Sequence, residues 1–269
     1  MPTNQEIKQI VKEKYGAIAA QSKERNQSSC CGGTSCCSTP DVSVVAEDYT
    51  QLSGYVADAD LGLGCGLPTE FAQIKQGDTV VDLGSGAGND AFVARSIVGD
   101  GGRVIGLDMT EEMIAKAKAN AVKLNFTNVE FRLGDIEKMP IADESADVVV
   151  SNCVMNLVPD KKKAFAETFR ILKHGGHFSI SDIVLKGELP ESVRKNAELY
   201  AGCISGAQQL SDYLDTITEA GFAHVKIQKQ RETEIPNEIL TNDLTADELQ
   251  DFKKRGVGIY SVTVYADKP

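Results

Sequence analysis

Short apolar runs alternate with amphipathic stretches through the middle of this chain. The apolar runs are typical of buried strands and lie at 78–83, 103–107, 129–133, 146–151 and 177–184. Between them, hydrophobic positions recur at helical spacing at 90–98, 111–124 and 161–172. Strands that alternate with helices at this spacing predict an α/β fold built on a parallel, doubly wound sheet.

Both ends of the chain follow other patterns. A helical stripe predicts a helix over 3–20, whereas residues 21–41 are rich in serine, glycine and cysteine and predict a mobile loop. Near the other end we expect helices and strands in the order 191–200, 211–220, 224–229 and 259–265. Only an irregular, acidic excursion (231–255) separates the last two strands, so they are expected to form an antiparallel hairpin at one edge of the sheet.

Residues with special backbone roles mark several boundaries. Thr110 is suited to be the N-cap of the helix at 111–124, and Gly175 and Gly176 lie in a turn that ends the helix at 161–172. We divide the chain into an N-terminal helix with a Cys-rich segment (1–49), a core (50–230) and an acidic excursion with the final strand (231–269).

Composition excludes several classes of protein. The chain has 269 residues, of which 42% are hydrophobic and 25% charged, as in ordinary globular proteins. A formal charge of −11 argues against a nucleic-acid partner. No apolar run of membrane-spanning length and no signal-peptide core is visible, so we expect a cytoplasmic protein that does not bind membranes. The lack of an obvious association motif favours a monomer.

A glycine-rich loop follows the first core strand. Asp82 leads into Gly84-x-Gly86-x-Gly88, where the glycines allow positive φ and a close approach of backbone amides to a ligand. Asp108 stands twenty residues past Gly88, at the end of the second strand, where a carboxylate can accept both ribose hydroxyls. The third glycine comes one residue earlier than in the dinucleotide fingerprint, which disfavours an NAD enzyme.

The segment from Asp82 to Asp147 resembles the S-adenosylmethionine-binding core of the class I methyltransferases. The stretch Val148–Lys161, together with Leu63–Gly66, Leu172–Gly176 and Gly202–Ala207, resembles the arsenite methyltransferases, and the likeness covers roughly residues 50–220. It implies a Rossmann-like, seven-stranded, mostly parallel sheet with one antiparallel edge strand, an N-terminal helical and Cys-rich extension and a C-terminal insertion. The residues expected at the cofactor are Asp82, Gly84, Ser85, Gly86, Gly88, Asp108, Met109, Asp135, Ile136, Glu137 and Asn152.

Three cysteines stand in the motifs of that family. Cys153 falls just past the fourth strand, at the crevice of a doubly wound sheet, although a cysteine there can also be a small buried hydrophobe. Cys65 lies in a loop too glycine-rich for core packing, and Cys203 would by itself pass as an inert helical cysteine. The resemblance implies that Cys65, Cys153 and Cys203 hold As(III) between thiolates, which are soft ligands suited to a thiophilic centre.

The remaining cysteines form two adjacent pairs, Cys30-Cys31 and Cys36-Cys37. They can capture As(III) and pass it inward, or one of them can form a disulfide with Cys65 during turnover, as the resemblance implies. A zinc knuckle is a third alternative, but adjacent cysteines lack the usual ligand spacing. A disordered tail with dispensable thiols is a fourth.

The predicted function is methyl transfer from S-adenosylmethionine to arsenite or its thiol conjugate, with a thiol reductant of the glutathione or thioredoxin type as co-substrate and arsenic detoxification as its role. A methyltransferase for a small organic acceptor, such as a quinone precursor, is one alternative. A thiol-based metalloid sensor without enzymatic activity is another. The chain also departs from many family members, because Leu63 replaces an aromatic residue and the C-terminal region is short.

Overall fold

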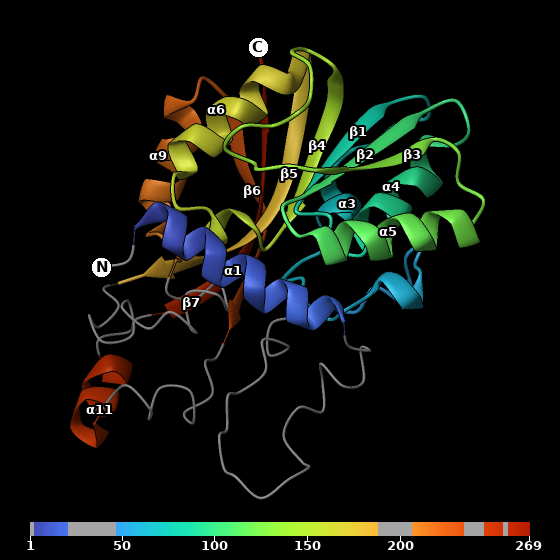
Figure 1. Ribbon diagram of the computed structural model, residues 1–269. Coiled ribbons are helices and arrows are strands. Elements are labelled where there is room, and N and C mark those ends of the chain that lie inside the picture. The colour runs from blue at the N-terminus through green and yellow to red at the C-terminus, as the bar shows by residue number, and fades with distance from the viewer. Residues whose placement is uncertain (1–2, 21–46, 188–205, 234–244, 255–257) are drawn as a thin grey trace, which may run out of the picture.

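The computed structural model describes residues 3–20, 47–187, 206–233, 245–254 and 258–269. Its centre is a seven-stranded sheet in the order β3-β2-β1-β4-β5-β7-β6 (Figure 1). The strands are β1 (Thr79–Leu83), β2 (Arg103–Asp108), β3 (Val129–Leu133), β4 (Ala146–Asn152), β5 (Leu172–Lys186), β6 (Ala223–Thr233) and β7 (Gly258–Asp267). β1 to β5 pair in parallel, whereas β7 is antiparallel to both β5 and β6. The Rossmann-like class I methyltransferase sheet is confirmed, with its antiparallel pair at one edge and β7 lying inside β6.

Helices cover both faces of this sheet. The described helices are α1 (Asn4–Ala19), α3 (Pro68–Phe71), α4 (Asn89–Val98), α5 (Glu111–Lys123), α6 (Lys161–Ile171), α9 (Leu210–Glu219) and α11 (Ala246–Lys254), with short 3₁₀ turns at Ala57–Ala59 and Met155–Leu157. Of these, α4 and α5 pack on one face of the sheet, and α6 and α9 pack on the other. Side chains of a strand alternate between faces, so Val80 packs with α4 and α5 while Val81 packs with α6 and α9. The result is the doubly wound arrangement that the alternating pattern predicts.

Some boundaries differ from the sequence-based prediction. β5 begins at Leu172, directly after α6, because the residues of the expected turn are part of the strand. The N–H of Gly175, for example, donates to the carbonyl of Lys268. The excursion between β6 and β7 was predicted to be irregular, yet it contains α11, and Thr245 and Glu248 cap that helix reciprocally. Thr110 is the N-cap of α5, but its side chain makes no capping hydrogen bond. The expected helix at 191–200 and the loop at 21–41 lie outside the described residues.

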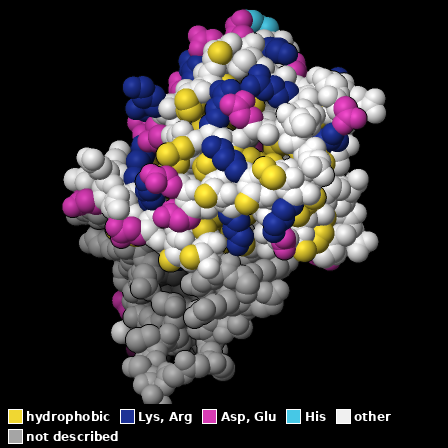
Figure 2. Space-filling model, turned by 45° about the vertical axis from the view of Figure 1, so that its right-hand side comes forward, with side chains coloured by type: hydrophobic (Ala, Val, Ile, Leu, Met, Phe, Trp, Pro, Cys, Tyr) yellow, Lys and Arg dark blue, Asp and Glu magenta, His cyan; other side chains and the backbone are white. Residues whose placement is uncertain are grey.

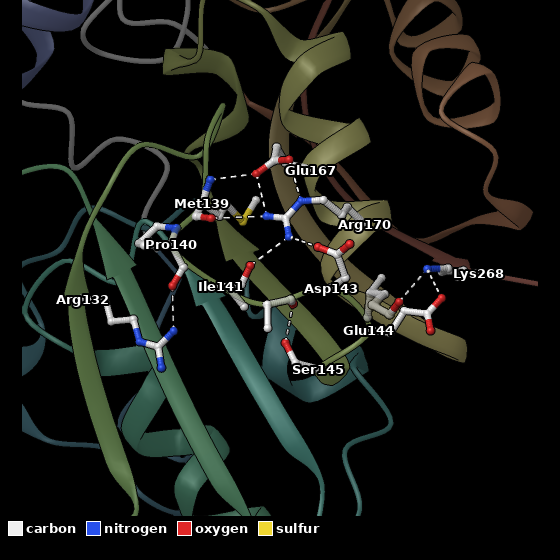
Figure 3. A network of polar contacts seen from close by, with 12 residues as sticks. Arg132, Met139, Pro140, Ile141, Asp143, Glu144, Ser145, Glu167, Arg170 and Lys268 are labelled. Atoms are coloured by element: carbon white, nitrogen blue, oxygen red, sulfur yellow. Dashed lines mark hydrogen bonds and ion pairs between the residues drawn. The ribbon is translucent and has the colours of Figure 1, made fainter.

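One arginine of α6 holds the connection between β3 and β4 (Figure 3). Arg170 donates to the carbonyls of Ile141 at 2.9 Å and Met139 at 3.2 Å, and it pairs with Glu167 at 2.7 Å. Glu167 in turn accepts the N–H of Met139 at 2.7 Å, and its pairing with Arg170 lowers the pKa of the Glu167 carboxyl. Because the connection begins just after β3 with Asp135, this arginine restrains a segment that borders the site described below.

The surface mixes charges of both signs. Figure 2 shows basic, acidic and hydrophobic side chains interspersed over one face of the molecule. Within the described part of the chain, no helix combines the length and apolar character needed to cross a membrane.

Candidate active site at the carboxyl ends of the strands

A hollow of ≈ 1090 Å³, which includes open solvent at its mouth, lies at the carboxyl ends of β1, β2 and β4 and is bordered by α1. Ligands of doubly wound sheets bind at this edge, where the strand order reverses. Its lining includes ten of the residues predicted from sequence: Asp82, Gly84, Ser85, Gly86, Asp108, Met109, Asp135, Ile136, Asn152 and Cys153.

The other predicted residues lie elsewhere. Gly88 and Glu137 do not belong to the lining, and Cys65 lies just behind Gly64, which does. Cys203 and the four cysteines before residue 40 lie outside the described residues. The structure therefore brings nine of the eleven predicted cofactor residues together with one of the three predicted arsenic ligands, and a second ligand, Cys65, follows the lining residue Gly64 in the chain.

The glycine loop bends the chain from β1 into α4. Gly84 has φ +68°, and a Cβ there would lie 2.4 Å from the side chain of Val154, so only glycine fits. Gly88 has φ +101° and is the N-cap of α4, where a Cβ would lie 2.8 Å from the ring of Phe92. The first of these glycines shapes the wall of the hollow, and the last allows close packing of α4 beneath it.

Asp108 occupies the end of β2. Its Oδ2 accepts the N–H of Gly86 at 3.0 Å, and its Oδ1 accepts the N–H of Thr110 at 2.8 Å. Burial raises the pKa of this carboxyl, and the two backbone N–H bonds partly oppose the rise. A carboxylate oxygen has a second lone pair, so each oxygen can accept one hydroxyl in addition. This geometry fits a ribose that offers two adjacent hydroxyls.

Two further carboxylates are buried behind the glycine loop. Oδ2 of Asp82 has no hydrogen-bond partner among the described residues, and burial raises its pKa well above the usual value, helped by the charges of Asp90 and Asp108. Asp90 accepts the hydroxyl of Tyr49 at 2.8 Å; burial raises its pKa to about 6 against the opposing effect of its hydrogen bonds. An orphaned carboxylate oxygen beside a hollow favours a cationic ligand there.

The charge of the lining is strongly one-sided. Of the described residues that form it, five are carboxylates and one is a lysine: Asp60, Asp82, Asp90, Asp108, Asp135 and Lys8. S-adenosylmethionine carries a sulfonium and an ammonium cation beside its single carboxylate. The donor set therefore fits that cofactor better than it fits an anionic nucleotide.

α1 borders the hollow on the side of Asp135. Lys8 pairs with Asp135 at 2.6 Å and with Glu137 at 2.8 Å, and Val11 and Tyr15 contribute to the lining. Carboxylate hydrogen bonds raise the pKa of the Lys8 amine, although burial opposes them as the largest single effect. Glu137 is thus engaged with α1.

The two described cysteines belong to one buried cluster, together with residues such as Leu157 and Ile183. Cys153 follows β4 with φ +60°, a left-handed conformation that non-glycine residues adopt rarely, and its N–H donates to the carbonyl of Ser181 at 2.8 Å. Cys65 is fully buried. A backbone strained at the edge of a hollow is typical of functional positions.

Sequence reasoning missed several residues of this site. Asp90 was identifiable in principle, since it is a carboxylate in a helix whose neighbouring side chains, Ala91 and Phe92, are buried. The apolar stripe containing Val11 predicted a helix but gave no sign of what that helix covers. Tyr49 carries no local signal, because its partners lie far away in the chain.

Comparisons with known proteins agree with this geometry. Residues 74–238 match a family described as methyltransferase domain. An arsenite methyltransferase of Halobacterium salinarum is 40% identical over 98% of this chain and 67% of its own, and the Mus musculus arsenite methyltransferase is 34% identical over 81% and 58%. An arsenic(III) S-adenosylmethionine methyltransferase of Chlamydomonas reinhardtii, known as a crystal structure, matches with a TM-score of 0.66 and 33% identity over 76% of this chain and 67% of that one. This chain thus spans about two thirds of the length of two of these relatives and less of the third.

The fold, the acid-lined hollow with its glycine loop, and identity to curated relatives over nearly the whole chain lead to one assignment. The chain belongs to the arsenite methyltransferase family.

Proposed function

We propose that this chain transfers a methyl group from S-adenosylmethionine to trivalent arsenic, bound as arsenite or a thiol conjugate by cysteine thiolates. One observation carries the proposal: Cys153 lines the same hollow as Asp82 and Asp108. A thiol beside a cofactor pocket can bring a soft, thiophilic substrate within reach of the cofactor. The relatives named arsenite methyltransferases support the same substrate.

We assign the cofactor to the side of the hollow that is lined by carboxylates. When bound, S-adenosylmethionine supplies an electrophilic methyl group that the lone pair of trivalent arsenic can take as the sulfur leaves as a thioether. Asp108 would accept the ribose hydroxyls, and Asp82 would face the cationic amino-acid end. Asp135 and Ile136 would border the adenine, next to Met109.

The arsenic is assigned to the thiols. Cys65 and Cys153 would each donate a thiolate sulfur, and Cys203 is proposed as the third ligand. Three sulfurs leave arsenic its lone pair, so the enzyme needs no general base for the transfer. Its main contribution is alignment, which can be worth several kcal/mol, on the order of 7–11.

Further roles are part of the same proposal. A cellular thiol of the glutathione or thioredoxin type would keep arsenic trivalent and the cysteines reduced. Cys30, Cys31, Cys36 and Cys37 are proposed as auxiliary thiols for capture or for a disulfide. The biological consequence would be arsenic detoxification by a monomeric enzyme.

Methyl-labelled S-adenosylmethionine, supplied with arsenite and a thiol reductant, tests the reaction. We expect label in methylarsenicals with the wild-type chain and none with Cys153→Ser, while both bind S-adenosylhomocysteine with similar affinity. Transfer that persists in Cys153→Ser would favour an organic acceptor. Stoichiometric As(III) binding with all label left in the cofactor would favour a metalloid sensor and contradict the proposal.

A further inference from the structure

Asn152 precedes Cys153 at the end of β4, but its side chain is engaged with the loop of the other cysteine. Its Oδ1 accepts the N–H of Cys65 at 3.0 Å and the N–H of Gly66 at 3.2 Å. Its Nδ2 donates to the carbonyl of Gly66 at 2.8 Å, to Asp90 at 3.2 Å, and to the hydroxyl of Tyr49. A carboxamide offers two lone pairs and two N–H groups, so this loop and its neighbours saturate it. Little hydrogen-bonding capacity is left for a cofactor.

The glycines around Cys65 allow this contact. A Cβ at Gly64 would lie 2.6 Å from Nδ2 of Asn152, and a Cβ at Gly66 would lie 2.5 Å from Oγ of Ser181. Real Cβ atoms essentially never come so close, so any larger residue would push the loop away from β4. The Gly-Cys-Gly pattern is therefore explained by packing against Asn152 and Ser181.

Both cysteines are anchored through their backbones to neighbouring strands, β7 and β5, which pair with each other. Ser261 of β7 donates its hydroxyl to the carbonyl of Cys65 at 2.5 Å. Ser181 of β5 accepts the N–H of Cys153 at 2.8 Å. Asn152 supplies the remaining link, because it is joined covalently to Cys153 and by hydrogen bonds to Cys65. The two thiols belong to segments 87 residues apart that are joined by one side chain.

We infer that Asn152 is a positioning residue that fixes the Cys65 loop against Cys153, so that both thiols can hold one arsenic atom. The inference rests on the proposed function. Without the carboxamide, the N–H groups of Cys65 and Gly66 would be buried without acceptors, and the loop would rearrange to satisfy them. A ligand pair that must first be ordered binds more weakly than a preorganised one.

Phenylarsine oxide tests the inference, since its arsenic condenses with two thiols, forming two As–S bonds and releasing one water. The experiment uses the full chain with Cys30, Cys31, Cys36, Cys37 and Cys203 replaced by serine, so that Cys65 and Cys153 are the thiols under test, and compares Asn152→Ala, Cys65→Ser and Asn128→Ala within that background. Asn128 is the matched control, because its amide also joins loops, those of Gly99 and Gly102, at the opposite end of the sheet. Affinity for S-adenosylhomocysteine and the melting temperature are measured for each variant.

We expect Asn152→Ala to weaken phenylarsine oxide binding about tenfold or more, toward the level of Cys65→Ser, while its affinity for S-adenosylhomocysteine changes less than about threefold. Asn128→Ala should match the background in phenylarsine oxide affinity at a similar melting temperature. If Asn152→Ala does not fold, Gly64→Ala disturbs the same contact from the other side and should show the same selective loss.

Three results would overturn the inference. Unchanged phenylarsine oxide affinity in Asn152→Ala beside a loss in Cys65→Ser would leave the thiol site intact and remove Asn152 from it. Selective loss of S-adenosylhomocysteine binding would make Asn152 a cofactor contact instead. Unchanged phenylarsine oxide affinity in Cys65→Ser would contradict the proposed arsenic site itself, and the role of Asn152 with it.

Discussion

The hollow has two sides that are built in opposite ways. On the cofactor side, the lining includes carboxylates with spare acceptor capacity, as the orphaned oxygen of Asp82 and the oxygens of Asp108, each with one bond, show. On the thiol side, the polar groups around Cys65 are hydrogen-bonded to one another. The side-chain amide of Asn152 bonds to the backbone of the Cys65 loop. The cofactor side is suited to bind cationic groups and hydroxyl groups. The thiol side is suited to keep the sulfur atoms of Cys65 and Cys153 in fixed positions.

This difference teaches where substitutions should act. Changes on the cofactor side should alter affinity for the cofactor and leave the thiols in place, whereas changes on the thiol side should do the reverse. The two sides meet at Asn152 and Cys153, which both line the hollow, so a substitution there can affect both affinities. The following experiments test the separation from the largest expected effect to the smallest.

Cys65→Ser should give the largest effect. In a background that also carries Cys203→Ser, this change removes one of two cooperating thiolates and turns a chelate into a single bond. The loss of effective concentration then predicts roughly 10³-fold weaker binding of phenylarsine oxide. Affinity for S-adenosylhomocysteine should stay within about threefold, since Cys65 does not line the hollow. Calorimetric titration of each ligand in turn measures both. Equal losses of the two affinities would show that the sides are not independent.

Asp108→Ala should have the opposite selectivity: it should weaken cofactor binding and leave arsenical binding unchanged. It removes an acceptor for two ribose hydroxyls, and hydrogen bonds to a charged group are worth about 1.5–3 kcal/mol each, so we expect roughly 100-fold weaker S-adenosylhomocysteine binding. Phenylarsine oxide affinity should not change. Asp100→Ala, an exposed carboxylate paired with Arg95, is the matched control and should alter neither affinity. A loss below about threefold would remove Asp108 from the cofactor site.

Asp182→Asn should change how the stability of the protein depends on pH. Asp182 of β5 is fully buried, and burial raises its pKa to about 7, opposed mainly by the charge of Lys161. A carboxyl with a raised native pKa binds more protons in the folded state, so it lowers stability as pH rises from about 4 to about 7. The variant lacks this titration. The difference between its free energy of unfolding and that of the wild type should therefore increase in favour of the variant, by on the order of 1–2 kcal/mol, between pH 5 and pH 7.5. Denaturant unfolding at both pH values measures the difference, and parallel pH profiles would contradict it.

Lys8→Ala should have the smallest effect. Its pairs with Asp135 and Glu137 join α1 to the edge of the hollow and are partly exposed, so together they contribute about 1 kcal/mol. We expect S-adenosylhomocysteine to dissociate about two- to fivefold faster, as followed by stopped-flow competition. Lys12 lies on the same helix as Lys8 and makes a longer pair, 3.6 Å, with Glu111 of α5; Lys12→Ala should leave the rate unchanged. Equal rates for Lys8→Ala and the wild type would show that this edge does not hold the cofactor.

Sequence reasoning was most successful where the signal is local. The predicted strand at 129–133 matches β3 residue for residue, and β1 and β2 match within one residue, because buried strands carry apolar runs. It failed where pairing partners decide the structure: β5 extends back to Leu172 because its start pairs with Ala146 of β4. It also missed α11, whose capping box at Thr245 and Glu248 was a readable signal.

The sequence by itself determined the alternation of strands and helices, the glycine loop, and the placing of Asp108, Asp135 and Cys153 at or just past the ends of strands. All of these depend on neighbours a few residues apart. Only the tertiary structure decided that the side chain of Asn152 bonds to the backbone of Cys65, and that α1 borders the hollow through Lys8. These contacts join residues 87 and 127 positions apart, and side chains at such separations are brought together by the packing of the whole sheet, which no local pattern encodes.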